Sequence, residues 1–197
     1  MDKASSVLHF FKRYFGSSLD LDLEETILQS FKREQFGKKE IIFRQGEHNT
    51  KHYIIQKGLL RLYLIDPNGK EINILFAREN QVIGDLATPD PTSFNLGTTE
   101  DSIVYSIEDI EFRKLFDQID VDSSVDAGGG LRRSYIHIQN RLVSILSKSA
   151  EENYLEFQQR YPDLIQRLPQ YHIASYLGIS PEFLSKIIAR TSRKKQV

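Results

Sequence analysis

The sequence predicts an α+β protein with a β-rich N-terminal part, a long helix and a small helical part at the C-terminal end. Between about residues 37 and 110, short segments rich in Ile, Tyr, Phe and Val alternate with turn residues. From Leu131 onwards, apolar residues recur at helical spacing instead. Hydrophobic residues make up 40% of the 197 residues and charged residues 27%, so the chain can bury a core of ordinary size.

Residues 1–36 are predicted to be helical, with Ile27, Leu28 and Phe31 on one face. The first fifteen residues mix Lys12 and Arg13 into a short apolar stretch with no small-residue cleavage site, which indicates a surface helix rather than a secretory signal. No apolar run approaches the roughly 18 residues of a membrane span, so we expect no membrane partner. The chain has no cysteine, which excludes disulfides and thiolate metal sites and suits a cytoplasmic protein.

The β-rich part is predicted to form a double-stranded β-helix, or jelly roll. Its clearest turn is Asp66–Lys70, "DPNGK", where proline presets one dihedral and Asn-Gly tolerates positive φ. The segment "EDIEFRKLFDQI" then predicts a short helix, followed by a polar break that ends in Gly128–Gly130. Because glycine is a poor helix former, we interpret this break as a hinge or loop.

The long helix carries an apolar seam with steps of 4, 3, 4 and 3, a spacing typical of a two-stranded coiled coil. A second apolar face on the same helix would pack on the protein's own domain. Two heptads are short for a coiled coil, so a single amphipathic helix in a monomer is the alternative. We favour a homodimer. The seam residues are Leu131, Tyr135, Ile138, Leu142 and Ile145, and the second face is Ile136, Val143 and Leu146.

The stretch "LPQYHIASYLGISPEFLSKII" predicts two short helices at helix-turn-helix spacing. Gly178 supplies the left-handed residue between them, Ser180 is the expected N-cap and Pro181 occupies the first helical position. The small residue Ala174 fits where the helices cross most closely. The predicted inner face is Ile173, Leu177, Ile179, Leu184 and Ile187.

The outward face of the second helix is predicted to carry Glu182, Phe183, Ser185, Lys186 and Arg190. Short polar and basic side chains on such a face can meet base edges and phosphates in a major groove. From 160 onwards the chain has seven Lys/Arg against two acidic residues, a net charge of +5, while the remainder carries −6. This asymmetry favours DNA binding over an ordinary helical hairpin with a polar surface.

A β-barrel, a long dimer helix and a helix-turn-helix in this order resemble the Crp/Fnr family of bacterial transcription regulators. The resemblance runs from about residue 20 to 190, through "IIFRQGE" (41–47), "IIQKGLLRLY" (54–63), "DPNGKE" (66–71), "VIGDL" (82–86) and the helix-turn-helix. It implies a sensor β-roll similar to a cyclic nucleotide-binding domain at 1–127, a dimerisation helix at 128–150 and a DNA-binding domain at 151–197.

The segment at the nucleotide cassette departs from the family pattern, which is Gly-Glu-Leu followed by an arginine. This chain has Gly84, Asp85 and Leu86, the candidate effector-pocket positions, but no Lys or Arg between Arg78 and Arg113. A cyclic phosphate would therefore lack its cation. We expect weak or absent cyclic AMP binding and interpret Asp85 and Leu86 as barrel residues rather than ligand groups.

Members of the family usually carry a small β-hairpin, the wing, beside the recognition helix. It has no counterpart after Thr191, so we expect the basic tail to contact the DNA backbone. The candidate DNA-binding residues are Ser180, Glu182, Ser185, Lys186, Arg190, Arg193, Lys194 and Lys195.

The sequence thus predicts a Crp/Fnr-type regulator that binds palindromic double-stranded DNA as a homodimer. RNA polymerase and an unidentified small-molecule effector stay open as further partners. A second hypothesis is a small-molecule-binding interaction protein without specific DNA binding.

A third hypothesis, a metal-dependent enzyme on a jelly roll, has weak support. His48 and His52 are the nearest pair of histidines and no acid is arranged beside them. No catalytic arrangement can be assigned, so we expect a non-enzyme without metal or cofactor.

Overall fold

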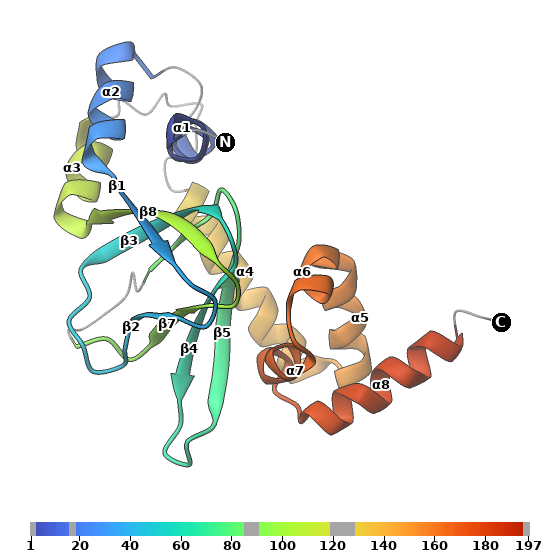
Figure 1. The fold of residues 1–197 in the computed structure, drawn as a ribbon. Helices are drawn as coiled ribbons and strands as arrows, with labels where there is room; N and C mark the ends of the chain where they lie inside the picture. The colour runs from blue at the N-terminus through green and yellow to red at the C-terminus, as the bar shows by residue number, and fades with distance from the viewer. Residues whose placement is uncertain (1–2, 16–18, 85–90, 119–128, 195–197) are drawn as a thin grey trace.

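The computed structural model describes residues 3–15, 19–84, 91–118 and 129–194. A β-roll carries three helices at one end, and a long helix leads from it to a group of four shorter helices (Figure 1). We call this group, residues 150–194, the helical unit. The helices are α1 (Lys3–Phe15), α2 (Leu21–Ser30), α3 (Asp109–Gln118), α4 (Gly129–Ser147), α5 (Ala150–Arg160), α6 (Pro162–Arg167), α7 (Gln170–Leu177) and α8 (Pro181–Lys194). The strands are β1 (Lys32–Phe36), β2 (Ile41–Phe43), β3 (Lys51–Lys57), β4 (Leu60–Ile65), β5 (Glu71–Ala77), β6 (Val82–Ile83), β7 (Asn95–Thr98) and β8 (Ser102–Glu108).

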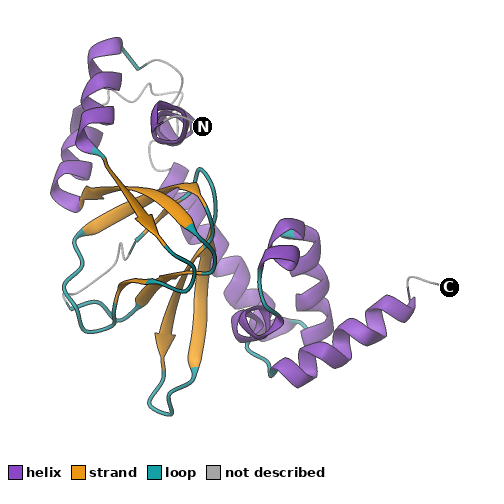
Figure 2. Cartoon of the chain, viewed as in Figure 1, coloured by secondary structure: helices purple, strands orange, loops and turns teal. Residues whose placement is uncertain are grey.

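The strands form two four-stranded antiparallel sheets, in the orders β1-β8-β3-β6 and β2-β7-β4-β5 (Figure 2). Alternate side chains point between the sheets and make one apolar core, as the period of two in a strand requires. The α+β class and the β-roll are therefore confirmed. The core residues are Phe43, Tyr53, Ile55, Leu60, Leu62, Ala77, Ile83, Leu96 and Val104.

The roll begins earlier than the sequence predicts, because residues 32–36 form β1 and not helix. The preceding helix α2 ends at Ser30, and Phe31 turns into extended backbone and buries its ring. Strand β1 is polar, and among the described strands its one neighbour is β8, from Lys32 opposite Ser106 to Phe36 opposite Ser102. The helical prediction was wrong here because an edge strand with one solvent-exposed face has no run of apolar residues that would mark it as a strand.

The predicted turn at Asp66–Lys70 joins β4 to β5. Asp66 donates its N–H to the carbonyl of Lys70 at 3.0 Å, and its carboxylate accepts from two further backbone amides. Gly69 has φ +79°, which an L side chain rarely adopts. This hairpin fixes the register of the two strands on which the helical unit docks.

Two further cores flank the roll. Helices α1, α2 and α3 pack their aromatic residues against its first sheet, around Phe11, Ile54 and Tyr105. The helical unit has its own core, which also includes Leu59 and Phe76 of the roll. Apolar packing is thus continuous from the second sheet into the helical unit.

The break predicted around the three glycines lies partly outside the described residues. Gly129 and Gly130 are the first two residues of α4, so the helix starts two residues before Leu131. The predicted end near Pro162 is seen as a change of helix, since α5 ends at Arg160 and α6 starts at Pro162. No described helix is both long and apolar enough to cross a bilayer.

Candidate nucleic-acid interface and its attachment to the β-roll

Helices α7 and α8 pack against each other as the inner-face pattern predicts. Ile173, Ala174, Leu184 and Ile187 are all buried. Gly178 caps α7 in the left-handed region, with φ 72° and ψ 24°, and this turns the chain toward α8. Leu177 and Ile179 pack at the margin of the same core. One face of α8 is therefore fixed in the core, and the other faces solvent.

The start of α8 has the predicted cap. The Ser180 hydroxyl accepts the N–H of Phe183 at 3.2 Å. Hydrogen bonds from its own backbone amide and from the Ser180 hydroxyl hold the pKa of the Glu182 carboxyl below its ordinary value. An ionised carboxylate at a helix N-terminus also interacts favourably with the helix dipole. Glu182 is therefore a cap as well as an exposed side chain.

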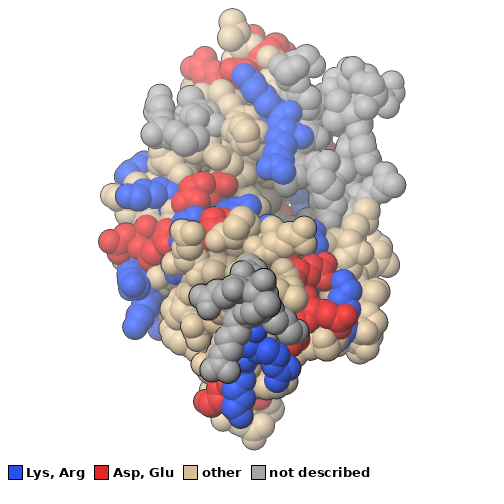
Figure 3. All heavy atoms as spheres, turned by 90° about the vertical axis from the view of Figure 1, so that its right-hand side faces the viewer, with Lys and Arg blue, Asp and Glu red and all other residues tan. Residues whose placement is uncertain are grey.

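The exposed face of α8 is mostly polar, with Phe183 exposed near its start. Ser185 and Lys186 are exposed one turn beyond the cap, and Arg190 follows one turn later. Arg190 donates to Glu151 of α5 at 3.2 Å but stays mostly exposed. Figure 3 shows Lys and Arg side chains gathered at the lower end of the face that carries α8.

Helix α8 continues to Lys194, so Arg193 and Lys194 belong to the helix and not to a loose tail. Their side chains and all of Lys195 lie outside the described atoms. The charge count from 160 onwards overstates the charge on this face, because Arg167 points to the β-roll. The basic residues of α8 that remain are Lys186, Arg190, Arg193 and Lys194.

Helix α4 exposes its seam. Tyr135, Ile138, Leu142 and Ile145 are all exposed, Ile138 by 64%. The side chain of Leu131 is not among those described. The second face does not pack on the protein's own domain as expected, because Ile136, Val143 and Leu146 are exposed too, Leu146 by 77%. A helix so apolar on its open sides requires a partner surface.

An arginine clamp attaches the helical unit to the roll. Arg167 of α6 donates to both oxygens of Glu79 at 2.9 and 3.0 Å, and to both oxygens of Glu100 at 2.6 and 3.3 Å. Burial opposes the ionisation of Glu79, but bonds from Arg167 and from the N–H of Gly58 outweigh it and lower the pKa of Glu79. The same carboxylates raise the pKa of Arg167.

The second attachment covers the free edge of β5. Ser175 of α7 accepts the N–H of Asn73 at 3.0 Å and donates to the carbonyl of Glu71 at 2.8 Å. Arg141 of α4 donates to the carbonyls of Ile74 at 2.8 Å and Asn73 at 3.2 Å. An edge strand otherwise exposes such groups to water or to another chain.

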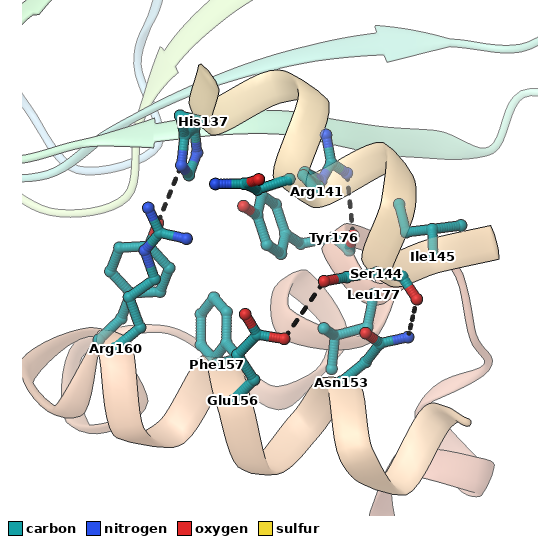
Figure 4. A pocket seen from close by; sticks show the side chains of 12 residues that line it. His137, Arg141, Ser144, Ile145, Asn153, Glu156, Phe157, Arg160, Tyr176 and Leu177 are labelled. Atoms are coloured by element: carbon teal, nitrogen blue, oxygen red, sulfur yellow. Dashed lines mark hydrogen bonds between the residues drawn. The ribbon is translucent and has the colours of Figure 1, made fainter. Parts of the chain in front are cut away.

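Arg141 also reaches α7. It donates to the carbonyl of Tyr176 at 2.9 Å, and its guanidinium lies 4.1 Å from the centre of the Tyr176 ring (Figure 4). Beside it the Nδ2 of Asn73 lies 3.2 Å from the Nδ1 of His172. Burial, assisted by the charge of Arg61, lowers the pKa of His172 to about 4. One guanidinium thus joins α4, β5 and α7.

The candidate effector positions are only partly described. Gly84 follows β6, and a Cβ there would lie 3.0 Å from the carbonyl oxygen of Lys51 and 3.2 Å from the Nδ1 of His52. This close approach is a packing requirement at Gly84 itself. Asp85 and Leu86 lie outside the described residues.

His52 has a structural partner in the roll. Its Nε2 lies 2.7 Å from Asp109, and its ring centre lies 4.7 Å from that of Phe112. The bond from His52, with the nearby Arg113, lowers the pKa of Asp109. Across the described residues, no group of three or more His, Cys, Asp or Glu is placed to hold a metal ion.

Comparison with known proteins agrees with this architecture. Residues 33–119 match the family described as the cyclic nucleotide-binding domain. A sequence search of functionally characterised proteins gave no match. The fold is similar to that of the c-di-GMP responsive global regulator CLP of Xanthomonas campestris, with a TM-score of 0.70 and 13% identity over 89% of this chain and 93% of that one.

Two further solved structures show a similar likeness over most of the chain. FixK2 of Bradyrhizobium japonicum gives a TM-score of 0.71 at 19% identity, over 84% of this chain and 86% of its own. A Crp/Fnr family protein from Eubacterium rectale gives 0.66 at 13% identity, over 89% and 85%. The chain has the Crp/Fnr fold. In this fold the β-roll, the long helix α4 and the helical unit stand in the order that the sequence predicts.

Sequence reasoning missed the residues that hold the Crp/Fnr fold together at its centre. Arg141, Arg167 and Asn73 lie in segments whose pattern only indicates helix or strand. Their partners are 35 to 102 positions away along the chain. A polar residue on an otherwise apolar strand, such as Asn73 in "EINILFA", was the one signal available.

Proposed function

We propose that this protein is a homodimeric transcription regulator of the Crp/Fnr type that reads palindromic DNA with α8. The observation that carries the proposal is the α7–Gly178–α8 arrangement. It fixes the apolar face of α8 in a core and leaves a mostly polar face exposed, on which Lys186 and Arg190 lie. Short polar side chains on such a helix fit a major groove, and basic ones meet the backbone. A role on bacterial DNA would place the protein in the cytoplasm.

The dimer supplies the symmetry that a palindrome requires. We assign residues 1–127 to a sensor domain, 128–150 to the dimerisation helix and 151–197 to the DNA-binding domain. The exposed apolar faces of α4 support this division, since burial of those side chains against a second α4 would remove a large apolar surface from water.

The dimer is tested by Leu142→Asp, which places a charge in the seam. Sedimentation should show the wild type as a dimer at micromolar concentration and the variant as a monomer. Asn140→Asp adds the same charge off the seam and should leave the dimer intact. A monomeric wild type would contradict the seam.

Within α8 we assign base contacts to Glu182, Ser185 and Lys186, with Ser180 at the helix start. Phosphate contacts are assigned to Arg190, Arg193, Lys194 and Lys195. Lys186→Ala should cost about 1–3 kcal/mol of DNA affinity and relax preference at one base position. Lys148→Ala, on the loop before α5, is the matched control and should change neither.

The basic end should act differently from Lys186. Replacing Arg193, Lys194 and Lys195 with Gln should weaken binding to all sequences alike. The slope of log affinity against log salt should become shallower by about 3, close to one unit for each lost phosphate contact. If Lys186→Ala leaves affinity and preference unchanged in binding-site selection, α8 is not the reading element and α7–α8 is an interaction surface.

The effector domain is proposed not to respond to cyclic AMP. The reason is the absence of Lys and Arg between Arg78 and Arg113, across the segment where the resemblance puts the phosphate cassette. Calorimetry should detect no cyclic AMP binding. An affinity in the micromolar range or tighter would contradict this.

A further inference from the structure

Phe183, in the first turn of α8, is an exposed aromatic residue on a mostly polar helix face. It is 46% exposed, whereas Leu184 and Ile187 of the same helix are buried. The large apolar residues that are exposed in the described part of the helical unit are Leu155, Tyr171 and Phe183, and Phe183 is the one on α8. A single exposed apolar side chain is ordinary on a protein surface, so its position has to indicate any role.

The packing of α8 fixes the direction in which this ring points. Because Leu184 and Ile187 are held in the core of the helical unit, the rotation of α8 about its own axis is set. Residues three, four and seven positions apart lie on one face of a helix. Phe183 therefore lies in line with Lys186 and Arg190, at one edge of the exposed face.

The backbone at Phe183 is held by the helix cap. The N–H of Phe183 donates to the Ser180 hydroxyl at 3.2 Å, and the N–H of Leu184 donates to the Ser180 carbonyl at 3.0 Å. Helix α8 runs along the side of the helical unit that is turned away from the β-roll (Figure 1). The N-terminal residues of a recognition helix are the ones that contact base edges, so the ring stands at the reading end of α8.

We propose that Phe183 contacts the C5 methyl group of a thymine in each half-site and so specifies a T·A base pair at that position. This rests on the proposed function of α8 as the helix that reads DNA. The thymine methyl is the apolar group that a base pair presents in the major groove, and an apolar side chain such as Phe is its contact partner. The contact removes the methyl group and part of the ring from water, which favours binding.

The charges beside Phe183 favour DNA over a protein partner. Lys186 is exposed on the same side of the helix, and Arg190 stays 62% exposed despite its bond to Glu151. The centre of a protein–protein interface is depleted of charged residues, and its aromatic anchors fill desolvated pockets. An aromatic ring followed by two cations instead fits a groove whose walls are phosphates and whose floor carries methyl groups.

The test removes only the methyl group from the DNA. Binding-site selection with the full-length protein gives the preferred sequence, and each thymine in it is then replaced by deoxyuridine, which lacks the C5 methyl. With the wild type, uracil at one position of each half-site should weaken binding about fourfold per half-site, the effect expected from burying one small apolar carbon group. Fluorescence anisotropy of labelled DNA measures the ratio of thymine-site to uracil-site affinity.

Variants assign this ratio to the ring. Phe183→Ala should bind the thymine and uracil sites equally, because the group that recognises the methyl is gone. Phe183→Leu keeps an apolar side chain and should still prefer thymine. Tyr171→Ala is the matched control, since it removes an exposed aromatic ring from α7, and it should leave the ratio unchanged.

The outcomes separate this proposal from the proposed function. A selected site with no methyl-sensitive thymine would overturn the role of Phe183 and leave α8 as the reading element. The same holds if Phe183→Ala distinguishes thymine from uracil as the wild type does, which would indicate that the ring contacts a protein. A wild type without sequence-specific binding would contradict the proposed function itself, and the role of Phe183 with it.

Discussion

The contact between the β-roll and the helical unit has two halves that differ in how their charges are satisfied. In one half Arg167, Arg141 and Asn73 each have defined partners across the contact. In the other half Arg160 and Arg13 line a cavity of about 440 Å³ between the roll and the helical unit, and its described lining has no carboxylate. The first half holds the two parts together through paired groups, and the second has arginines that make no described ion pair across the contact.

This difference has an energetic meaning. An arginine that makes no ion pair across the contact adds little to it, whereas paired groups across the contact stabilise it. Substitutions in the first half should therefore lower stability, and those in the second half should change it little. The predictions below separate the halves, from the largest expected effect to the smallest.

Arg141→Met should be the most damaging change. It keeps the aliphatic part of the side chain but leaves the carbonyls of Ile74, Asn73 and Tyr176 without their donor. Buried acceptors left unsatisfied cost about 1–3 kcal/mol each, so the loss should be roughly 3–5 kcal/mol. Urea unfolding measures it. Arg113→Met, at an exposed arginine, is the control, and an equal effect of the two would refute the role of Arg141.

Acid should weaken the same half through His172. Its pKa is about 4 in the folded protein, against an ordinary value near 6.5, so below pH 6.5 the unfolded chain takes up a proton that the folded protein does not. Stability is complete above pH 6.5 and falls as the pH drops from 6.5 to 4, by up to about 3 kcal/mol.

His172→Gln removes this titration and keeps a hydrogen-bonding side chain beside Asn73. The variant should be less dependent on pH between 6.5 and 4 than the wild type, as measured by urea unfolding at a series of pH values. Parallel pH curves for the two proteins would show that His172 does not carry the effect.

The smallest effects come from single arginines at the rims of the two halves. Arg167→Gln should cost about 1–2 kcal/mol at low salt and less at high salt, because its carboxylate partners are partly exposed. Arg160→Gln should leave stability within about 0.5 kcal/mol of the wild type or raise it slightly. Thermal unfolding at two salt concentrations measures both. A loss at Arg160 as large as that at Arg167 would remove the distinction between the halves.

Local patterns predicted the elements that depend on neighbours in sequence. The β-roll, the turn at Asp66–Lys70 and the α7–Gly178–α8 packing follow from strand alternation, turn chemistry and helical spacing, and the structure confirms them. The edge strand β1 was missed, because its polar residues carry no period and only pairing with β8 makes them a strand.

The docking contacts could not be predicted from local patterns. Arg167 was counted with the basic end, yet it pairs with Glu79 and Glu100 in loops of the roll. The two apolar faces of α4 were expected to have one partner each, and both are exposed. A sequence shows that a side chain needs a partner, but the choice among distant partners depends on the tertiary fold.

The single guanidinium of Arg141 has a consequence for the time course of any domain motion. Its bonds tie α4 to both β5 and α7, so when α7 leaves the strand edge Arg141 can keep its bonds to only one of them, and the carbonyls of the other lose their donor. Separation of the roll from the helical unit therefore breaks at least one set of these bonds. Such collective transitions occupy the microsecond-to-second range. A ligand that favours one population changes how often the transition occurs, and leaves the two end states as they are.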